Sequence, residues 1–161
     1  MSPDAALSIS PQVPTAGWAA RGDPAGSRQL CRDGWEAEVI LEAVRWAWSV
    51  RPATPECQRY LRRLGGQMRG SSWTVTDAMQ QAELAIAVCN PGCGAEVLDG
   101  ASRNRNISIR HAVAIHPACP PGTLVCLLQD QDWTVAFEAA RNANLPREDL
   151  RVWHRAVRRS A

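Results

Sequence analysis

The sequence contains no lysine, a single tyrosine and a single phenylalanine, and it has no long apolar run. A membrane-spanning helix needs about 20 consecutive apolar residues, and no stretch approaches that length. All 18 basic residues are arginines, but this composition is only a weak indication of phosphate binding. The net charge of +2 is too small to identify a partner, so function must be inferred from the arrangement of residues.

The usual motifs of catalysis are missing as well. We find no nucleotide-binding glycine loop, no His-Glu-x-x-His motif and no nucleophile elbow. A metal-dependent hydrolase would need an open coordination position and a neighbouring general base. Only Glu96 and Asp99 lie close to the cysteine pair at positions 89 and 93. We therefore expect a protein that is not an enzyme, with an uncharacterised metal- or cysteine-dependent enzyme as the alternative.

The N-terminal residues predict a tail rather than a targeting segment. Residues 1–28 mix Pro, Ala, Gly and Ser without periodicity, which predicts a mobile tail. They lack the basic start and apolar run of a secretory signal, so we expect a cytoplasmic protein. In that reducing compartment the six cysteines are thiols or metal ligands rather than disulfides.

Three amphipathic segments predict a helical bundle over residues 29–88. In the first, apolar residues recur at helical spacing behind Asp33, which can cap the helix. The second begins with a capping Thr54 and stops at Gly65-Gly66. Cys31 and Cys57 are expected to be small buried apolar residues. The expected helices span 33–50, 54–64 and 76–88.

A β-hairpin is predicted to follow the bundle. From Ile107 to Ile115 apolar residues alternate strictly with small or polar ones, which is typical of a strand. Asp99-Gly100 ahead of this segment is a turn signal. Residues 95–115 are therefore expected to form a hairpin whose far end returns to its start. His111 is interpreted as a core histidine on the inward face.

Two pairs of metal-binding residues flank this predicted hairpin. Cys89 and Cys93 enclose Asn-Pro-Gly, and such a tight turn lets two thiolates converge on one ion. The hairpin would return His116 and Cys119 to them. Four such ligands suit a tetrahedral structural Zn²⁺ with no position open for catalysis. The alternative is that these four side chains are simply buried, and Cys126 is expected in the core.

Residues 89–122 resemble the zinc-ribbon and LIM-type treble-clef modules. Their pattern is a cysteine pair followed by Gly, a β-hairpin and His-x-x-Cys. This chain departs from it because three residues rather than two separate Cys89 from Cys93. The resemblance implies a structural zinc ion as the cofactor.

Residues 123–161 are predicted to form a short strand, from Leu124 to Leu128, and a helix-turn-helix. The run A-A-x-x-A-N-L-P-x-x-x-L-x-x-W closely resembles bacterial helix-turn-helix DNA-binding domains. That resemblance implies a scaffold of Ala140, Asn144, Leu145, Leu150 and Trp153. It implies base-facing residues at Arg147, Glu148, Arg151 and His154, and phosphate-facing residues at Arg155, Arg158 and Arg159.

The fold class expected from the sequence is mainly α with a small zinc-bound β-hairpin. The expected function is a zinc-stabilised protein that binds double-stranded DNA, as a bacterial or phage transcription regulator or accessory factor. The alternative is a non-catalytic interaction module with a structural zinc, which binds a partner protein or a second copy through Trp73 or Trp133. A merely solvated basic face also fits the C-terminal arginines.

Overall fold

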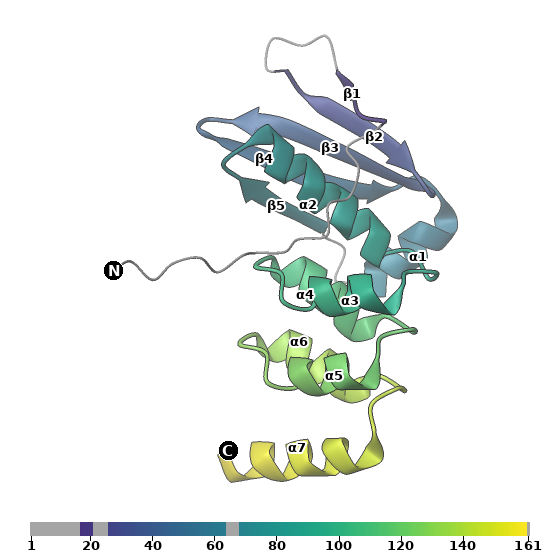
Figure 1. Cartoon of the computed structure of the whole chain (residues 1–161), viewed down its shortest axis with the longest axis vertical. Helices are drawn as coiled ribbons and strands as arrows, with labels where there is room; N and C mark the ends of the chain where they lie inside the picture. Colours follow the sequence, from purple (N-terminus) through teal and green to yellow (C-terminus); the bar gives the residue numbers. More distant parts are fainter. Residues whose placement is uncertain (1–16, 21–25, 64–67, 161) are drawn as a thin grey trace.

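The computed structural model describes residues 17–20, 26–63 and 68–160, in which an open β-sheet is joined to a stack of helices (Figure 1). The sheet is antiparallel, and its five strands lie in chain order, β1-β2-β3-β4-β5. Seven helices occur in the same ranges. The fold is therefore α+β, and the predicted N-terminal helical bundle with a zinc-bound hairpin is wrong.

The sheet occupies the segment in which the first helix was predicted. Trp35, Ala37 and Val39 are buried, while Glu36 and Glu38 between them are half-exposed, so β3 has the period of two of a strand. The strands are β1 (Ala19–Ala20), β2 (Arg28–Arg32), β3 (Trp35–Glu42), β4 (Arg45–Pro52) and β5 (Met68–Ser72).

Tight turns explain why this segment folds as strands. Asp33 and Gly34 have φ values of 52° and 79°, and Ala43 has a φ of 54°. These left-handed residues reverse the chain before and after β3, which a continuous helix from 33 to 50 would not allow. Ala19 and Ala20 of β1, which fall within the predicted tail, pair with Gln29 and Arg28 of β2. Residues 1–16 and 21–25 of that tail lie outside the described residues.

Two of the predicted helices are confirmed as α1 (Pro55–Arg63) and α2 (Val75–Val88). The expected stop at Gly65-Gly66 lies outside the described residues. Helix α2 packs on β3, β4 and β5 and covers one face of the sheet (Figure 1). Ala78, Ala82 and Ala85 are fully buried there, and such small side chains let the helix lie close to the sheet.

Gly70 in β5 lets helix α4 approach the sheet. A Cβ at this position would lie 2.7 Å from the Trp48 ring and 2.4 Å from the side-chain nitrogen of Asn106, which is too close for either. That Asn106 amide donates a 2.9 Å hydrogen bond to the carbonyl of Arg69. Its oxygen caps α4 by accepting from the backbone N–H of Ser108 at 2.8 Å. One asparagine thus starts α4 and fixes it to the edge strand.

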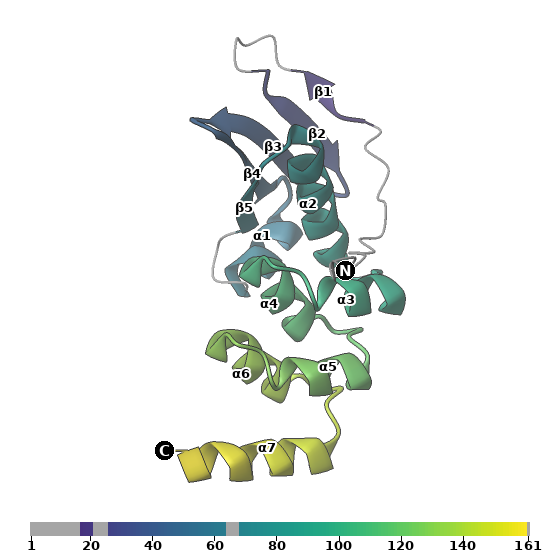
Figure 2. The same cartoon turned by 60° about the vertical axis from the view of Figure 1, so that its left-hand side comes forward.

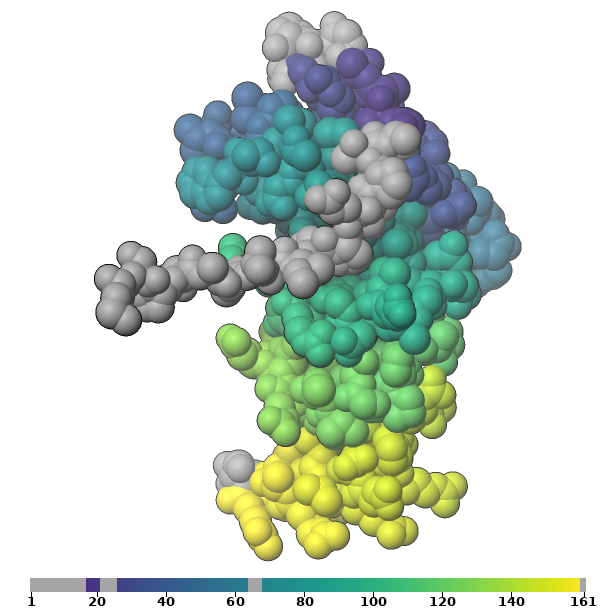
Figure 3. Space-filling model, viewed as in Figure 1, coloured from purple at the N-terminus to yellow at the C-terminus, as the bar shows by residue number. Residues whose placement is uncertain are grey.

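The remaining chain forms two helical hairpins and a final helix, stacked in successive layers (Figures 2 and 3). Leu98, Leu124 and Leu150 recur every 26 residues in the first, third and fifth of these helices. Asn106 and Asp132, also 26 apart, cap the second and fourth. The helices are α3 (Ala95–Ala101), α4 (Ile107–Ile115), α5 (Pro121–Leu127), α6 (Trp133–Arg141) and α7 (Arg147–Ser160).

This arrangement is that of a short solenoid, in which each repeat packs mainly on its neighbours. Helix α4 contacts both α2 and α6, while α5 contacts α6. Helix α2 therefore joins the sheet to the stack, and α7 forms its far end (Figure 1). No helix among the described residues is long and apolar enough to cross a membrane.

The strands predicted at 107–115 and 124–128 are wrong, as is the hairpin at 95–115, because these residues form α3, α4 and α5. In α4 the buried residues include Ile109, Ala112 and Val113, which have the i, i+3, i+4 spacing of a helix. Alternation predicted a strand because Ala112 and Ala114, which suit either environment, occupy two of the four positions between the large residues.

Candidate functional site

The four predicted zinc ligands lie at the ends of helices. Cys89 is the C-terminal cap of α2, Cys93 precedes α3, His116 is the C-terminal cap of α4, and Cys119 precedes α5. Within the described ranges, no group of three or more His, Cys, Asp or Glu side chains is arranged to hold a metal ion. Cys93 and Cys119 are 26 residues apart, so they occupy equivalent positions in successive repeats instead of facing each other across a hairpin.

His116 takes part in a repeated hydrogen-bond pattern between the layers. Its Nδ1 accepts from the backbone N–H of Ala118 at 3.1 Å, so Nε2 carries the proton and donates to the carbonyl of Asn90 at 3.0 Å. The residue 26 positions later, Asn142, accepts from Asn144 N–H at 3.0 Å and donates to the His116 carbonyl at 3.0 Å.

His116 and Asn142 therefore form equivalent hydrogen bonds in successive repeats. Asn90, 26 positions before His116, likewise accepts from the N–H two residues on, that of Gly92, at 2.9 Å. Each of these side chains shapes the turn after its helix. His116 and Asn142 also join their layer to the preceding one. Because both ring nitrogens of His116 have partners, zinc binding would require one of these hydrogen bonds to be given up.

The cysteine environments also differ from those of a preformed site. Burial raises the pKa of the Cys89 thiol, and the neighbouring Cys57 and Cys93 raise it further. Burial raises the pKa of Cys119 to about 12, with a smaller contribution from Asp99. Zinc is bound by thiolates, so a metal would have to overcome these raised values. Zinc binding at these residues stays a prediction.

The other residues of uncertain role are placed as follows. Cys31 and Cys126 are exposed, so their predicted burial is wrong, whereas Cys57 is half-buried against the core. His111 is half-buried on α4, and its Nδ1 atom is buried without a hydrogen-bond partner among the described residues.

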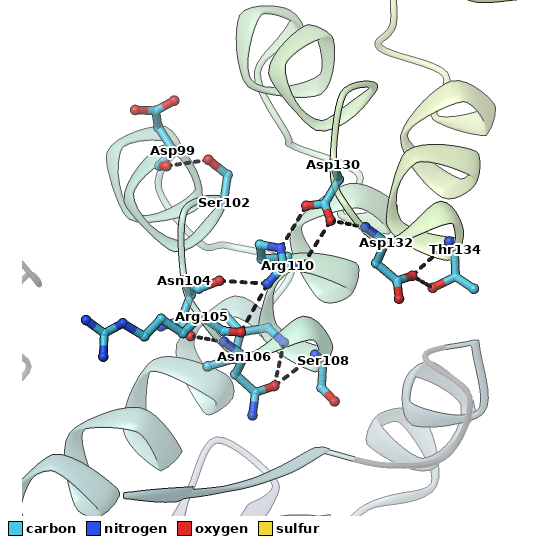
Figure 4. A network of polar contacts seen from close by, with 11 residues as sticks. Asp99, Ser102, Asn104, Arg105, Asn106, Ser108, Arg110, Asp130, Asp132 and Thr134 are labelled. Atoms are coloured by element: carbon cyan, nitrogen blue, oxygen red, sulfur yellow. Dashed lines mark hydrogen bonds and ion pairs between the residues drawn. The ribbon is translucent and has the colours of Figure 1, made fainter. Parts of the chain in front are cut away.

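An arginine that sequence reasoning did not single out connects the two hairpins (Figure 4). Arg110 of α4 donates to both carboxylate oxygens of Asp130, at 2.7 and 2.9 Å, and to the carbonyls of Asn104 and Arg105. Burial by itself would raise the pKa of Asp130, but hydrogen bonds from Arg110 and from the N–H of Asp132 outweigh it and lower the pKa.

The predicted nucleic-acid-binding residues lie together on α7. All six are exposed, and we call them the arginine face: Arg147, Arg151, His154, Arg155, Arg158 and Arg159. Arg151, His154, Arg155 and Arg158 line a shallow hollow. Some arginines elsewhere have acidic partners, in the pairs Arg51–Glu38, Arg59–Glu56, Arg103–Asp99, Arg110–Asp130 and Arg141–Glu138. In the described part of the chain, the five arginines of α7 have none.

An aromatic surface lies where α7 meets α6. The Trp133 ring of α6 stacks on Trp153 of α7 with centroids 5.5 Å apart and planes at 21°, and Phe137 lies 6.1 Å from Trp133. Trp133 is 56% exposed and Phe137 41%, and Val152, the residue before Trp153 in α7, is 61% exposed. We call Trp133, Phe137, Val152 and Trp153 the end surface.

Comparisons with protein-family models, with curated proteins and with solved structures found no match, so the functional argument rests on this chain's own residues.

Proposed function

We propose that this chain is a non-catalytic nucleic-acid-binding protein that holds the phosphate backbone of a DNA duplex on α7. The observation that carries the proposal is the arginine face, where five exposed guanidinium groups lie on one helix without acidic partners in the described structure. Arginine is suited to this role because its planar, permanently charged fork matches a phosphate with two parallel hydrogen bonds.

The spacing of these arginines supports a continuous contact. Arg147, Arg151, Arg155 and Arg158 follow one another at three- or four-residue intervals, which places them along one side of the helix. The two acids of α7, Glu148 and Asp149, lie in its first turn, where the helix dipole favours them. The remaining turns of the helix therefore present positive charge alone.

The helical stack next to α7 holds this helix in the fixed position that a contact with DNA phosphates needs. Leu145 and Leu150 anchor the start of the helix to the core, and the bond pattern of Asn142 fixes the turn before it. A helix held in this way loses little conformational entropy when it binds, so the entropy cost that opposes the electrostatic attraction is small.

The test is a titration of a fluorescent 20-base-pair duplex by fluorescence anisotropy. Arg151→Gln with Arg155→Gln keeps the helix but removes two phosphate contacts, so affinity should fall at least tenfold at low salt. The matched control is Arg59→Gln with Arg62→Gln on α1, which removes the same charge from another exposed helix. Equal affinity in both double variants would reject the arginine face as the binding site.

A protein-interaction module is the second candidate, because two tryptophans lie on the surface. Trp73 is 68% exposed beneath the guanidinium of Arg45, which lies 3.9 Å from its ring, and Trp133 is 56% exposed. Exposed tryptophans are typical centres of protein interfaces. Nucleic-acid-free protein that binds no duplex at low salt but forms a defined protein complex would favour this function.

A further inference from the structure

Four basic side chains of the arginine face surround one shallow hollow on the surface of α7. The residues that line it are Arg151, His154, Arg155 and Arg158, and its volume is about 270 Å³. They occupy positions i, i+3, i+4 and i+7 of the helix, so they form one contiguous patch. Among the described residues, no acidic side chain lines this hollow. Its border therefore consists of three guanidinium groups and one imidazole.

The arginines of this patch repel one another unless an anion lies between them. Arg155 is four residues from Arg151 and three from Arg158, and like charges at these spacings destabilise a helix. In contrast, Arg59 and Arg141 on other helices each form an ion pair with a glutamate three residues earlier. An anion bound in the hollow would offset the repulsion, so the patch favours an occupied state.

His154 is held at the edge of the hollow by aromatic contacts. The centroid of its ring lies 5.4 Å from that of Trp153, which in turn stacks on Trp133 of α6 at 5.5 Å. These contacts connect the imidazole to the helical stack. A hydrogen-bonding group that is already held in place loses little conformational entropy when a ligand binds.

We propose that this hollow binds the terminal phosphate monoester of a nucleic-acid strand, an inference that rests on the proposed binding of nucleic acid by α7. A phosphate monoester carries about 1.5–2 negative charges at pH 7 and has three acceptor oxygens. A backbone diester has a single charge and only two free oxygens. Because each guanidinium fork can donate two parallel hydrogen bonds, three forks around one hollow match the monoester better than the diester.

The arginines outside the hollow favour a nucleic-acid strand over a small phosphorylated molecule. Arg147 lies one turn before Arg151, at the start of α7. Arg159 directly follows Arg158, near the end of the helix. Both are exposed, and neither has an acidic partner within the described ranges. A strand continues from its terminal phosphate as a row of diesters, which these two arginines can contact, whereas a small molecule would leave them without a ligand.

The experiment compares three duplexes of about 20 base pairs that share one sequence and differ only at their ends. The ends carry 5′-phosphates, 3′-phosphates or hydroxyl groups alone, and binding to the full chain is measured by fluorescence anisotropy at about 50 mM salt. We expect one phosphorylated duplex to bind about fivefold or more tightly than the hydroxyl duplex. Its slope of log K against log salt concentration should also be steeper by about 1, because one more phosphate is contacted.

Two neighbouring arginines provide the variant and its matched control. Arg158→Gln removes a guanidinium from the hollow and should abolish most of the preference for a phosphorylated end. Arg159→Gln removes the same charge from the next residue, which does not line the hollow. It should weaken the binding of all three duplexes alike and leave the ratio of their affinities unchanged. Glutamine is a good helix former, so both variants should keep α7 helical, as circular dichroism can check.

The possible outcomes separate this inference from the proposed function. Equal affinity of the wild type for phosphorylated and hydroxyl duplexes would overturn the terminal-phosphate site and leave duplex binding intact. Binding to none of the three duplexes would overturn both. A preference that persists in Arg158→Gln would show that the hollow is not the site. A nucleoside 5′-monophosphate that competes as strongly as the phosphorylated duplex would overturn the assignment to a nucleic-acid strand.

Discussion

The ion pair between Arg110 and Asp130 is expected to be the strongest single polar connection between the two helical hairpins. The side chains are 16% and 6% exposed, and two parallel hydrogen bonds join them. Arg110→Ala would leave the Asp130 carboxylate buried without its partner and the carbonyls of Asn104 and Arg105 without a donor. Removing one member of a buried pair costs about 3 kcal/mol or more.

The matched control is Arg103→Ala. Arg103 forms a pair of the same 2.7 Å length with Asp99, but the two side chains are 67% and 45% exposed. Exposed pairs contribute below about 1 kcal/mol. Urea denaturation should therefore separate the variants by about 2 kcal/mol at an unchanged m value, with Tm lowered by about 6–12 °C for Arg110→Ala.

A double-mutant cycle decides whether the loss belongs to the pair. Arg110→Ala, Asp130→Ala and the combined variant should give a coupling energy above about 1.5 kcal/mol. Equal losses for Arg110→Ala and Arg103→Ala, or a coupling energy below about 0.5 kcal/mol, would refute the reasoning from burial.

Three further predictions concern acid stability, the layer contacts and the metal. The pKa of Asp130 in the folded state lies below the ordinary value of 3.8, so its contribution to stability is present above about pH 4 and is lost as the pH falls further. Asp130→Asn should therefore flatten the acid limb of a Tm-against-pH curve. His116→Asn should lower the free energy of unfolding less than His116→Ala, by about 1 kcal/mol, because asparagine fills the equivalent places at 90 and 142; equal losses would contradict the shared role. The zinc prediction expects about one zinc per purified chain by mass spectrometry, lost together with the fold in Cys93→Ser, while metal-free protein of unchanged Tm would reject it.

The helices α1, α2, α6 and α7 could be predicted from the sequence because their caps and periodicity agree. The segment from Trp35 to Val50 could not, since it is so rich in apolar residues that a helical stripe and a strand alternation both fit it. The left-handed turns at Asp33-Gly34 and Ala43 decide between them, and only the first contains a glycine.

The 26-residue repeat was present in the sequence but is easily missed, because its members change residue type. The side chains of Asn90, His116 and Asn142 each accept a hydrogen bond from the backbone N–H two residues on, although histidine and asparagine differ chemically. Cys93 and Cys119 were interpreted as metal ligands. Their equivalent positions in two repeats become clear only from the 26-residue spacing of Leu98, Leu124 and Leu150. The arginines of α7 could be identified from the sequence because their helical spacing does not depend on tertiary contacts.

The most direct test of the central claim, that the arginine face binds duplex phosphates, is the salt dependence of binding by the wild-type chain. Each phosphate contacted contributes about −0.9 to the slope of log K against log salt concentration. Contacts by four or five arginines therefore predict a slope of about −4 between 50 and 200 mM salt. A slope weaker than about −1, or no binding at 50 mM, would contradict the account.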